Sequence, residues 1–375
     1  MAGIYIHIPF CRKACYYCDF HFSTGMKTIP LMVKAIQKEL ELTKEHFKYP
    51  IDTLYFGGGT PSTLTISDLE KILEVLYKNY AISDMAEITM EANPDDLTKD
   101  YLYALKKIGI NRLSIGIQSF EDSVLLEINR CHTSKQALSS FENARNAGFD
   151  NISIDLIYGL PKTSIHSLEH DLETILKIQP DHVSVYGLTI EDKTVFGHQH
   201  KKGLLKILSE EEESERFELI MDFLENNGHI QYEISNFGKP GKESKHNSSY
   251  WEGKPYLGIG PSSHSFEKNE RWKNVSNNTQ YIKSINQGIL PREHEIRDKN
   301  DLFNEYILTT LRTIKGCNTQ LIMDKWGIII DLQSNPILAR YEQEGYLWIE
   351  NKIIHLTRKG KLMADQIASD LFIIE

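Results

Sequence analysis

The sequence predicts an α/β fold: a partial (β/α)6 barrel of the TIM type, followed by an α+β accessory module at the C-terminal end. Apolar, β-prone runs alternate with helical stretches six times within about the first 190 residues, which is typical of a parallel sheet. Chemically unusual residues follow four of these runs and lie late in a fifth, toward the end of the strands where barrels carry their active sites. From about residue 298 the pattern changes to short helices and a hairpin.

The strands follow from apolar runs, and the helices follow from the wider apolar spacing between those runs. We expect strands at residues 4–8, 53–56, 87–90, 112–117, 152–157 and 182–188. We expect helices at residues 28–46, 67–80, 99–108, 134–147 and 164–178. Gly109, Gly148 and the pair Gln179-Pro180 end three of these helices, because glycine adopts the left-handed backbone of a helix end and proline cannot continue a helix. Six units are too many for a small sheet and too few for a complete eight-stranded barrel.

The rest of the chain predicts an extension of the barrel and a small separate domain. We expect a barrel over residues 1–200, an extension over 201–297 and a winged-helix-like domain over 298–375. Two strands around Glu350-Asn351-Lys352 predict a hairpin, and Thr357-x-x-Gly360 predicts the start of the last helix. Winged helices are commonly associated with DNA, but the acidic chain favours protein contact or a lid.

Composition and charge exclude several classes of protein. The formal net charge of −10 argues against a sequence-independent nucleic-acid binder, which needs a basic face. No run approaches the roughly 18 apolar residues of a membrane span, so we expect no transmembrane segment. Cys131 and Cys317 are isolated, so no disulfide framework is present and a cytoplasmic location is expected. A cleaved signal peptide is not expected, because its removal would delete the cysteine loop described next.

Three cysteines stand on one short loop after the first predicted strand, as Cys11-Arg-Lys-Ala-Cys15-Tyr-Tyr-Cys18. Three thiolates can hold three irons of a cubane cluster and leave the fourth iron open to a substrate or cofactor. A structural zinc site needs a fourth ligand, and a disulfide would leave one cysteine over. Three unrelated buried cysteines are the remaining alternative. The spacing favours an iron–sulfur cluster, with Cys11, Cys15 and Cys18 as its ligands.

The ends of the next four predicted strands also carry unusual residues. They are Gly57-Gly58-Gly59-Thr60-Pro61, Glu91 with Asn93-Pro94, Gln118, and Asp155. Each alone has an ordinary structural explanation, as a turn, a loop breaker or a buried cap. Their common position at the carboxyl ends of strands favours one shared site. The triple glycine is not a Walker loop, because no Gly-Lys-Ser/Thr follows, and it would allow close approach of the backbone to a ligand.

The Cys-x3-Cys-x2-Cys spacing, the aromatic residue before the third cysteine and the glycine-rich second loop together resemble the radical S-adenosylmethionine superfamily. In that superfamily the open iron chelates the amino and carboxylate groups of S-adenosylmethionine. The reduced cluster passes one electron to the sulfonium, which releases methionine and a 5′-deoxyadenosyl radical. The resemblance therefore implies a [4Fe-4S] cluster and S-adenosylmethionine as cofactors.

Longer stretches resemble the family of oxygen-independent coproporphyrinogen III oxidases and their paralogues, the HemW heme chaperones. The resemblance covers nearly the whole chain and is carried by Tyr5-Ile-His-Ile-Pro-Phe-Cys11, Phe56-Gly-Gly-Gly-Thr-Pro61, Gly116-Ile-Gln-Ser-Phe120, Ile154-Asp-Leu-Ile-Tyr-Gly-Leu-Pro161, Gln231-Tyr-Glu-Ile-Ser-Asn-Phe237 and Tyr256-Leu-Gly-Ile-Gly-Pro261. Carried over by position, it implies S-adenosylmethionine contacts from Tyr5, Tyr17, Gly58, Gly59, Thr60, Glu91, Gln118, Arg130 and Asp155. In this assignment the adenine lies beside Tyr17, the glycines and Thr60 meet the methionyl end, and Asp155 suits the ribose hydroxyls. Arg130 suits the carboxylate, although by itself it is an ordinary charge at a helix end.

Three departures separate the chain from the oxidases and favour a heme chaperone. The oxidase motif continues Cys-x-Cys, whereas Phe20 stands here, and the oxidases carry a long segment before the cysteine loop, whereas ten residues stand here. His246-Asn-Ser-Ser-Tyr-Trp251 resembles the heme-binding HNxxYW stretch of the chaperones. Imidazole is an axial iron ligand and aromatic residues pack on a porphyrin, although a loop histidine beside Tyr-Trp also occurs as a structural cap. We expect His246 to bind heme, with His264 as a second candidate.

The resemblance implies a chaperone that delivers heme to respiratory enzymes at the cytoplasmic face of the inner membrane. Its expected partners are heme and the heme-accepting respiratory proteins, with no nucleic acid. Two enzyme alternatives stay open: oxidative decarboxylation of coproporphyrinogen III, and radical chemistry on another substrate with a purely structural histidine motif. No catalytic residue is assigned, and the heme acceptor and the oligomeric state, including a homodimer, stay open.

Overall fold

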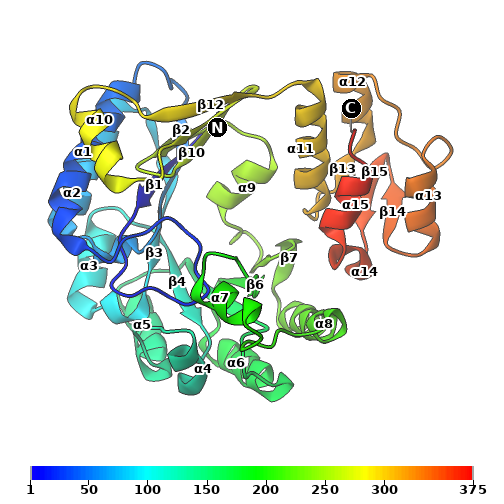
Figure 1. Cartoon of the computed structure of the whole chain (residues 1–375), viewed down its shortest axis with the longest axis horizontal. Helices are drawn as coiled ribbons and strands as arrows, with labels where there is room; N and C mark the ends of the chain where they lie inside the picture. The colour runs from blue at the N-terminus through cyan, green and yellow to red at the C-terminus, as the bar shows by residue number, and fades with distance from the viewer. Residues whose placement is uncertain (1, 374–375) are drawn as a thin grey trace.

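Six parallel strands make up the centre of one curved sheet, and helices cover its convex face (Figure 1). The structure is a computed structural model that describes residues 2–373. The central strands are β1 (Ala2–Ile8), β2 (Ile51–Gly58), β3 (Ile82–Ala92), β4 (Arg112–Gln118), β5 (Ile152–Tyr158) and β6 (His182–Gly187). All six predicted strands are confirmed, and β3 is longer than predicted at both ends.

The five predicted helices of the barrel are also confirmed. They are α1 (Ile29–Thr43), α2 (Ile66–Asn79), α3 (Lys99–Lys107), α5 (Ser134–Asn146) and α6 (Ile165–Ile178). Thr65 begins α2 by accepting a hydrogen bond from the Asp68 amide, and Thr133 begins α5 in a reciprocal capping box with Gln136. The prediction did not include the short α4 (Asp122–Glu127), which is too brief to show an apolar period.

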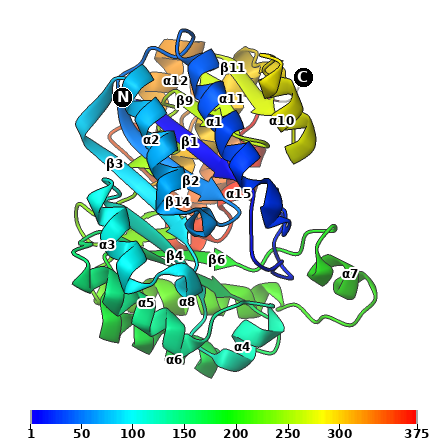
Figure 2. The same ribbon diagram turned by 90° about the vertical axis from the view of Figure 1, so that its left-hand side faces the viewer.

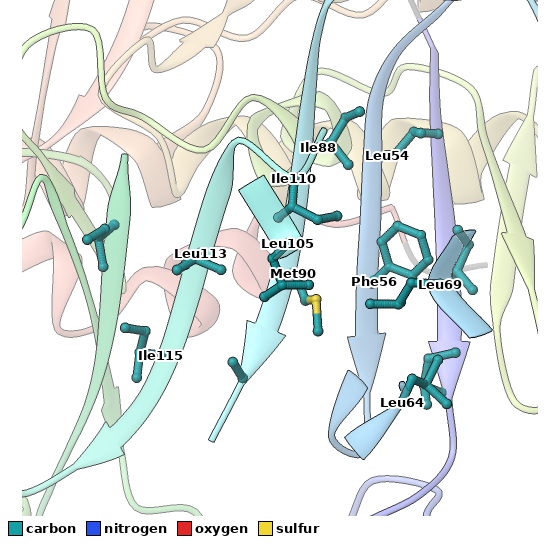
Figure 3. Close-up of a cluster of buried hydrophobic side chains, with 14 of the residues drawn as sticks. Leu54, Phe56, Leu64, Leu69, Ile88, Met90, Leu105, Ile110, Leu113 and Ile115 are labelled. Carbon is teal, nitrogen blue, oxygen red and sulfur yellow. The ribbon is translucent and has the colours of Figure 1, made fainter. Parts of the chain in front are cut away.

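Apolar and polar side chains alternate along the central strands, which gives the sheet two different faces. Figure 3 shows strand side chains that pack with Leu69 of α2 and Leu105 of α3 on the helix-covered face. The strand residues of this cluster are Leu54, Phe56, Ile88, Met90, Leu113 and Ile115, and all are buried. Tyr55, Glu91 and Ser114 alternate with them and therefore belong to the inner, concave face.

The sheet extends beyond the six predicted strands at both edges. Beyond β6 lie β8 (Asn236–Gly238) and then β7 (Ile230–Glu233), each antiparallel to its neighbour. Beyond β1 lie β9 (Tyr256–Ile259), which is parallel to it, and then the antiparallel β10 (His264–Glu267), β11 (Glu270–Asn274) and β12 (Arg292–Ile296). These strands were not predicted because they are short and partly polar: all but the first residue of β12 are exposed.

The residues after Asp298 pack around a second apolar core of their own. Their elements are α11 (Lys299–Leu311), β13 (Cys317–Asn318), α12 (Thr319–Trp326), α13 (Pro336–Gln343), β14 (Leu347–Glu350), β15 (Ile353–Leu356), α14 (Arg358–Lys361) and α15 (Ala364–Asp370). The predicted hairpin is present between β14 and β15, and Asn351 and Lys352 take positive φ angles at its turn. We call residues 298–373 the C-terminal module. The division of the chain at residues 200 and 297 remains a proposal.

Two further segments lie near the open side of the sheet. Figure 2 shows that the segment with α7 (Val195–Lys201) projects from the body beside the N-terminal loop, and the Phe196 amide donates a hydrogen bond to the Tyr16 carbonyl there (3.0 Å). In Figure 1, α9 (Lys245–Trp251) lies on the concave side of the sheet, between the strands and α11. The long α8 (Glu210–Asn226) starts at Ser209. Among the described residues, no helix has both the length and the apolar character that crossing a bilayer requires.

Candidate functional site

The three cysteines follow β1 on one half-buried loop, and none forms a disulfide. Thr60 Oγ1 donates a hydrogen bond to Cys11 Sγ (3.3 Å), and Arg130 Nη1 donates one to Cys15 Sγ (3.4 Å). Burial raises the pKa of Cys11 to about 11 and that of Cys18 to about 12. Among the described residues, no three His, Cys, Asp or Glu side chains are arranged to bind a single metal ion. A cubane cluster has a different requirement, because its cysteine ligands attach to separate irons.

The glycine loop after β2 lies directly against the cysteine loop. The Gly59 amide donates to the Ile8 carbonyl (2.9 Å), and a Cβ at Gly59 would stand 2.8 Å from the Phe10 carbonyl oxygen. Gly58 has a φ of +108°, and a Cβ there would stand 2.6 Å from the His7 ring. Both positions therefore require glycine if the two loops are to touch. This packing explains the glycines structurally and leaves their backbone beside the cysteines.

Glu91 connects the end of β3 to the glycine loop. Its carboxylate accepts hydrogen bonds from the Tyr55 hydroxyl (2.8 Å) and the Gly58 amide (3.1 Å). Burial raises the pKa of Glu91 to about 7. Tyr5 stacks on Tyr55 with ring centroids 6.0 Å apart, and its hydroxyl donates to His7 Nδ1 (3.2 Å). The structure thus brings three of the predicted residues, Tyr5, Gly58 and Glu91, to one end of the inner face.

Arg130 connects the cysteine loop to the ends of β3 and β4. Besides Cys15, its guanidinium donates to Asn93 Oδ1 (2.7 Å) and to the Gly116 carbonyl (2.5 Å). The buried Nε of Arg130 has no hydrogen-bond partner among the described residues. Tyr17 is close enough that the positive charge of Arg130 lowers its pKa, although burial raises that pKa by more. The two terminal nitrogens already serve protein acceptors, so a ligand carboxylate would have to share or replace them.

Gln118 ends β4, and Asp155 lies on the inner face in the middle of β5. Gln118 has a φ of 73°, and the register between the two strands shifts beside it. Backbone strain at a non-glycine residue concentrates at functional sites. Asp155 accepts a hydrogen bond from the Ser114 hydroxyl (3.2 Å), and burial raises its pKa to about 6. Asp155 and Glu91 interact electrostatically, so two carboxyl groups with raised pKa share this region.

Two inner-face residues that sequence analysis did not select belong to the same region. Arg112 on β4 is only 1% exposed, and its Nε has no partner among the described residues. Its positive charge opposes the effect of burial on the pKa of Glu91 and Asp155. His7 Nε2 donates to the His21 carbonyl (2.8 Å), and burial lowers the pKa of His7 to about 4. The available signal for Arg112 was a charge in an apolar strand, two positions before Ser114.

His246 was expected in a loop, and this location is wrong because the residue lies in α9. Ser244 begins the helix by accepting a hydrogen bond from the Asn247 amide, although Asn and Ser are weak helix formers. His246 is 1% exposed, with Nδ1 2.7 Å from Thr53 Oγ1 and Nε2 2.7 Å from the Tyr250 hydroxyl. Burial lowers its pKa to about 3, so the ring is neutral. Both ring nitrogens have partners, so iron cannot bind either of them in this conformation.

The described residues enclose a cavity of about 1450 Å³ between α9 and the C-terminal module. Tyr250 and Trp251 line it from α9, and Tyr306 and Trp326 line it from α11 and α12. His246 is not among the lining residues. Basic residues outnumber acidic ones in the lining: seven are basic, namely Lys245, Lys254, Lys268, Arg297, Lys299, Lys315 and Lys325, and five are acidic, namely Asp52, Glu243, Glu252, Asp298 and Glu305. Aromatic and basic side chains together suit a flat apolar ligand that carries acidic groups.

The cavity and the cysteine loop lie toward opposite ends of the strands. Ala2 and Thr53, which line the cavity, stand near the start of β1 and β2, whereas the cysteine loop follows the end of β1. Thr53 and Gly58 are separated along β2 by on the order of 16 Å, given the rise of a strand. His264, the second histidine candidate, is exposed on β10 and does not line the cavity. The structure therefore contains two candidate sites.

A model of the radical SAM superfamily matches residues 5–175. The heme chaperone HemW of Bacillus subtilis is 37% identical over 372 residues, which cover 98% of each chain. The heme chaperone HemW of Lactococcus lactis is 34% identical over 364 residues, which cover 95% of this chain and 93% of that protein. A zebrafish (Danio rerio) protein, radical S-adenosyl methionine domain-containing protein 1, mitochondrial, is 36% identical over 70% of this chain and 60% of its own.

Among solved structures, coproporphyrinogen III oxidase (HemN) from Escherichia coli matches with a TM-score of 0.85. The match covers 98% of this chain and 89% of the oxidase, at 24% sequence identity. The likeness extends through the sheet and the C-terminal module, and at this identity it is a likeness of fold. It confirms the predicted partial barrel.

Proposed function

The chain belongs to the family of HemW heme chaperones within the radical S-adenosylmethionine superfamily, and from this premise we propose that it binds heme, a [4Fe-4S] cluster and S-adenosylmethionine, and delivers the heme to respiratory enzymes. The observation that carries the proposal is the aromatic and basic cavity beside the HNxxYW helix. The acceptors are proposed to be respiratory proteins at the cytoplasmic face of the inner membrane, and the chain is proposed to act in the cytoplasm.

Cys11, Cys15 and Cys18 are the proposed cluster ligands. Two of these sulfurs already receive hydrogen bonds, from Thr60 and Arg130, and such donors stabilise thiolate ligands. The loop is half-buried, which suits a cluster that must be shielded from water yet reachable by a small ligand. When bound, the cluster supplies the single electron that cleaves S-adenosylmethionine in this superfamily.

The proposed S-adenosylmethionine pocket is the inner face beside the cysteine loop. The half-buried backbone of Gly58 and Gly59, with the hydroxyl of Thr60, suits the methionyl end of the ligand. The carboxyl groups of Glu91 and Asp155 suit an ammonium group and ribose hydroxyls. Tyr5, Tyr17, Gln118 and Arg130 complete the proposed pocket. The unpartnered Nε of Arg130 supports it, because a buried guanidinium N–H without an acceptor is costly.

Heme is proposed to occupy the cavity between α9 and the C-terminal module. Trp251 would cover apolar porphyrin surface, Tyr250 would lie against the heme beside it, and the basic lining residues would face the propionates. His246 lies behind Tyr250 and can reach iron only if the bond between them breaks. The heme site and the cluster site are therefore proposed to be separate.

The enzyme alternative is oxidative decarboxylation of coproporphyrinogen III. The fold likeness to the oxidase is compatible with it, but Phe20 stands where the oxidase motif has a further cysteine. The Phe20 side chain is 72% exposed beside the cysteine loop, and phenylalanine cannot supply thiol chemistry. The absence of that thiol favours the chaperone.

One experiment separates the proposals. The anaerobically reconstituted protein is titrated with heme, and a parallel sample with S-adenosylmethionine and a one-electron reductant is given coproporphyrinogen III. We expect saturable heme uptake and no protoporphyrinogen. Formation of protoporphyrinogen would establish the oxidase instead, and a lack of both results would leave radical chemistry on another substrate.

A further inference from the structure

Tyr250, rather than His246, lies at the surface of the proposed heme cavity. Tyr250 lines the cavity, whereas His246 does not. The Tyr250 hydroxyl stands 2.7 Å from His246 Nε2, and His246 Nδ1 stands 2.7 Å from Thr53 Oγ1. The histidine ring is further fixed by stacking on Tyr55, with centroids 4.9 Å apart. Hydrogen bonds and stacking therefore fix the His246 ring in the protein interior, and the Tyr250 side chain lies between this ring and the cavity.

We propose that Tyr250 is the axial ligand of ferric heme in this cavity, and that His246 positions the tyrosine oxygen and supports it as a phenolate. The inference rests on the proposed heme-binding function. Tyrosinate is an established axial ligand of heme iron. A hard, anionic oxygen matches ferric iron better than ferrous iron.

The hydrogen bonds around His246 fit this assignment. A neutral imidazole donates from one ring nitrogen and accepts at the other. The Thr53 hydroxyl can donate to Nδ1, which leaves Nε2 with its proton, aimed at the Tyr250 oxygen. Ligation of ferric heme would replace the Tyr250 O–H bond by an iron–oxygen bond, with the proton released to solvent and no electron transferred. His246 Nε2–H would then donate to the phenolate oxygen.

The neighbouring rings hold Tyr250 for this role. Its ring meets His246 edge to face at 5.0 Å and Tyr256 edge to face at 4.5 Å. Trp251, next in the chain, lines the same cavity under the guanidinium of Arg312, 5.6 Å from the indole centroid. In this proposal Tyr250 would ligate iron while Trp251 covers the porphyrin.

The test compares ferric heme complexes of the full chain and three variants by absorption, electron paramagnetic resonance and resonance Raman spectroscopy. We expect the unaltered chain to give a high-spin ferric signal with a phenolate-to-iron charge-transfer band and tyrosinate vibrations. Tyr250→Phe should lose all three signatures and bind heme about tenfold more weakly or worse. Tyr103→Phe is the control, because Tyr103 is exposed on α3 and does not line the cavity, and its spectrum should match that of the unaltered chain. His246→Ala should keep tyrosinate ligation with a shifted charge-transfer band.

Two results would overturn the assignment. One is an unchanged spectrum in Tyr250→Phe, and the other is a low-spin imidazole spectrum in the unaltered chain that His246→Ala removes. Should Tyr250→Phe fail to fold, the tyrosinate vibrations of the unaltered complex decide alone, and their absence overturns the proposal. Failure of the unaltered chain to take up heme would instead refute the proposed function itself, and the ligand assignment with it.

Discussion

The five cysteines occupy three different surroundings. Cys11, Cys15 and Cys18 share one half-buried loop, Cys131 is exposed, and Cys317 is buried in the apolar core of the C-terminal module. Cys11 receives a hydrogen bond from Thr60 of the glycine loop, and Cys15 receives one from Arg130, which follows α4. Cluster binding should therefore depend on the first group alone.

Cys15→Ala removes one of the three proposed iron ligands. We expect anaerobic reconstitution of this variant to give no stable [4Fe-4S] cluster, measured by iron and sulfide content and by electron paramagnetic resonance of the reduced protein. Cys131→Ala is the control and should reconstitute fully, because Cys131 is exposed and lies outside the three-cysteine loop. A complete cluster in Cys15→Ala would refute the ligand assignment.

Glu91 makes the stability of the ligand-free protein depend on pH. Its pKa is about 7 in the folded chain, against about 4.3 in a model peptide. The folded state thus holds a proton that the unfolded chain releases between these values. The protonated carboxyl makes its full contribution to the free energy of unfolding below about pH 4, and this contribution is lost as the pH rises through 7. Glu91→Gln cannot ionise, and its one amide oxygen can accept from one of the two donors, because the Tyr55 hydroxyl and the Gly58 amide bond different carboxylate oxygens.

Between pH 5 and pH 8 the unaltered chain should therefore lose about 1–3 kcal/mol of unfolding free energy relative to Glu91→Gln. Urea denaturation at both pH values measures the difference. Glu74→Gln, on an exposed position of α2, should follow the unaltered chain. Parallel pH profiles for Glu91→Gln and the unaltered chain would show that the Glu91 carboxyl does not change its ionisation on folding.

At the residue scale, spacing in the sequence was enough to find the cysteines, the glycines and the strand-end carboxylates. Arg112 and His7 were missed because each stands inside a stretch assigned to another role. The partners of His246 could not be predicted, since Thr53 lies 193 positions away along the chain and meets it only through the placement of α9 on the sheet.

At the scale of elements, the glycine loop and the cysteine loop pack backbone against backbone, which leaves little space for a side chain. Gly59 is limited by contact: a Cβ would stand 2.8 Å from Phe10 and 2.9 Å from Ile8, all backbone atoms. Gly148 is limited only by its φ of +86°, because nothing lies within 4 Å of a Cβ there. Glycine is therefore required at position 59 because a side chain would clash, and at position 148 because the backbone is left-handed.

Gly59→Ala should destabilise the chain by about 3 kcal/mol, since backbone on both sides cannot move apart cheaply. Gly148→Ala should cost only about 1–2 kcal/mol, the strain of a left-handed alanine. Urea denaturation measures both, and cluster reconstitution should fail in Gly59→Ala but succeed in Gly148→Ala. Equal losses in the two variants would mean that the loops separate without cost.

The elements themselves divide into those with and those without a periodic signal. The central strands and their helices were predictable because long apolar runs alternate with helix-period stretches. Strands β7 to β12 have three to five residues each and pair by tertiary context. Helix α9 was missed because Asn-Ser-Ser lowers helix propensity, although Ser244 followed by Asn247 was an available capping signal.

At the scale of the whole molecule, the cavity exists only because the C-terminal module stands beside α9. Arg312 lies over Trp251, and Lys315 pairs with Glu252 at 2.5 Å, so both contacts join the module to the end of α9. The sequence predicted the module but could not predict this placement, since exposed charges and single aromatic rings carry no periodic signal. The heme-sized space is a property of the assembled chain.

Trp326 tests whether the module takes part in heme binding. It lines the cavity from α12, and its indole N–H donates to the Lys299 carbonyl (3.1 Å). Trp326→Ala removes a large aromatic surface from the cavity, so heme affinity should fall about tenfold, or ~1.4 kcal/mol.

Trp348→Ala is the control. Trp348 lies on β14, is 43% exposed, stacks on His355 and does not line the cavity. Heme titration measures both variants, and cluster content should be unchanged in each, because the cysteine loop lies toward the other end of the strands. If Trp326→Ala binds heme as tightly as Trp348→Ala does, heme does not contact the module and must bind on the barrel alone.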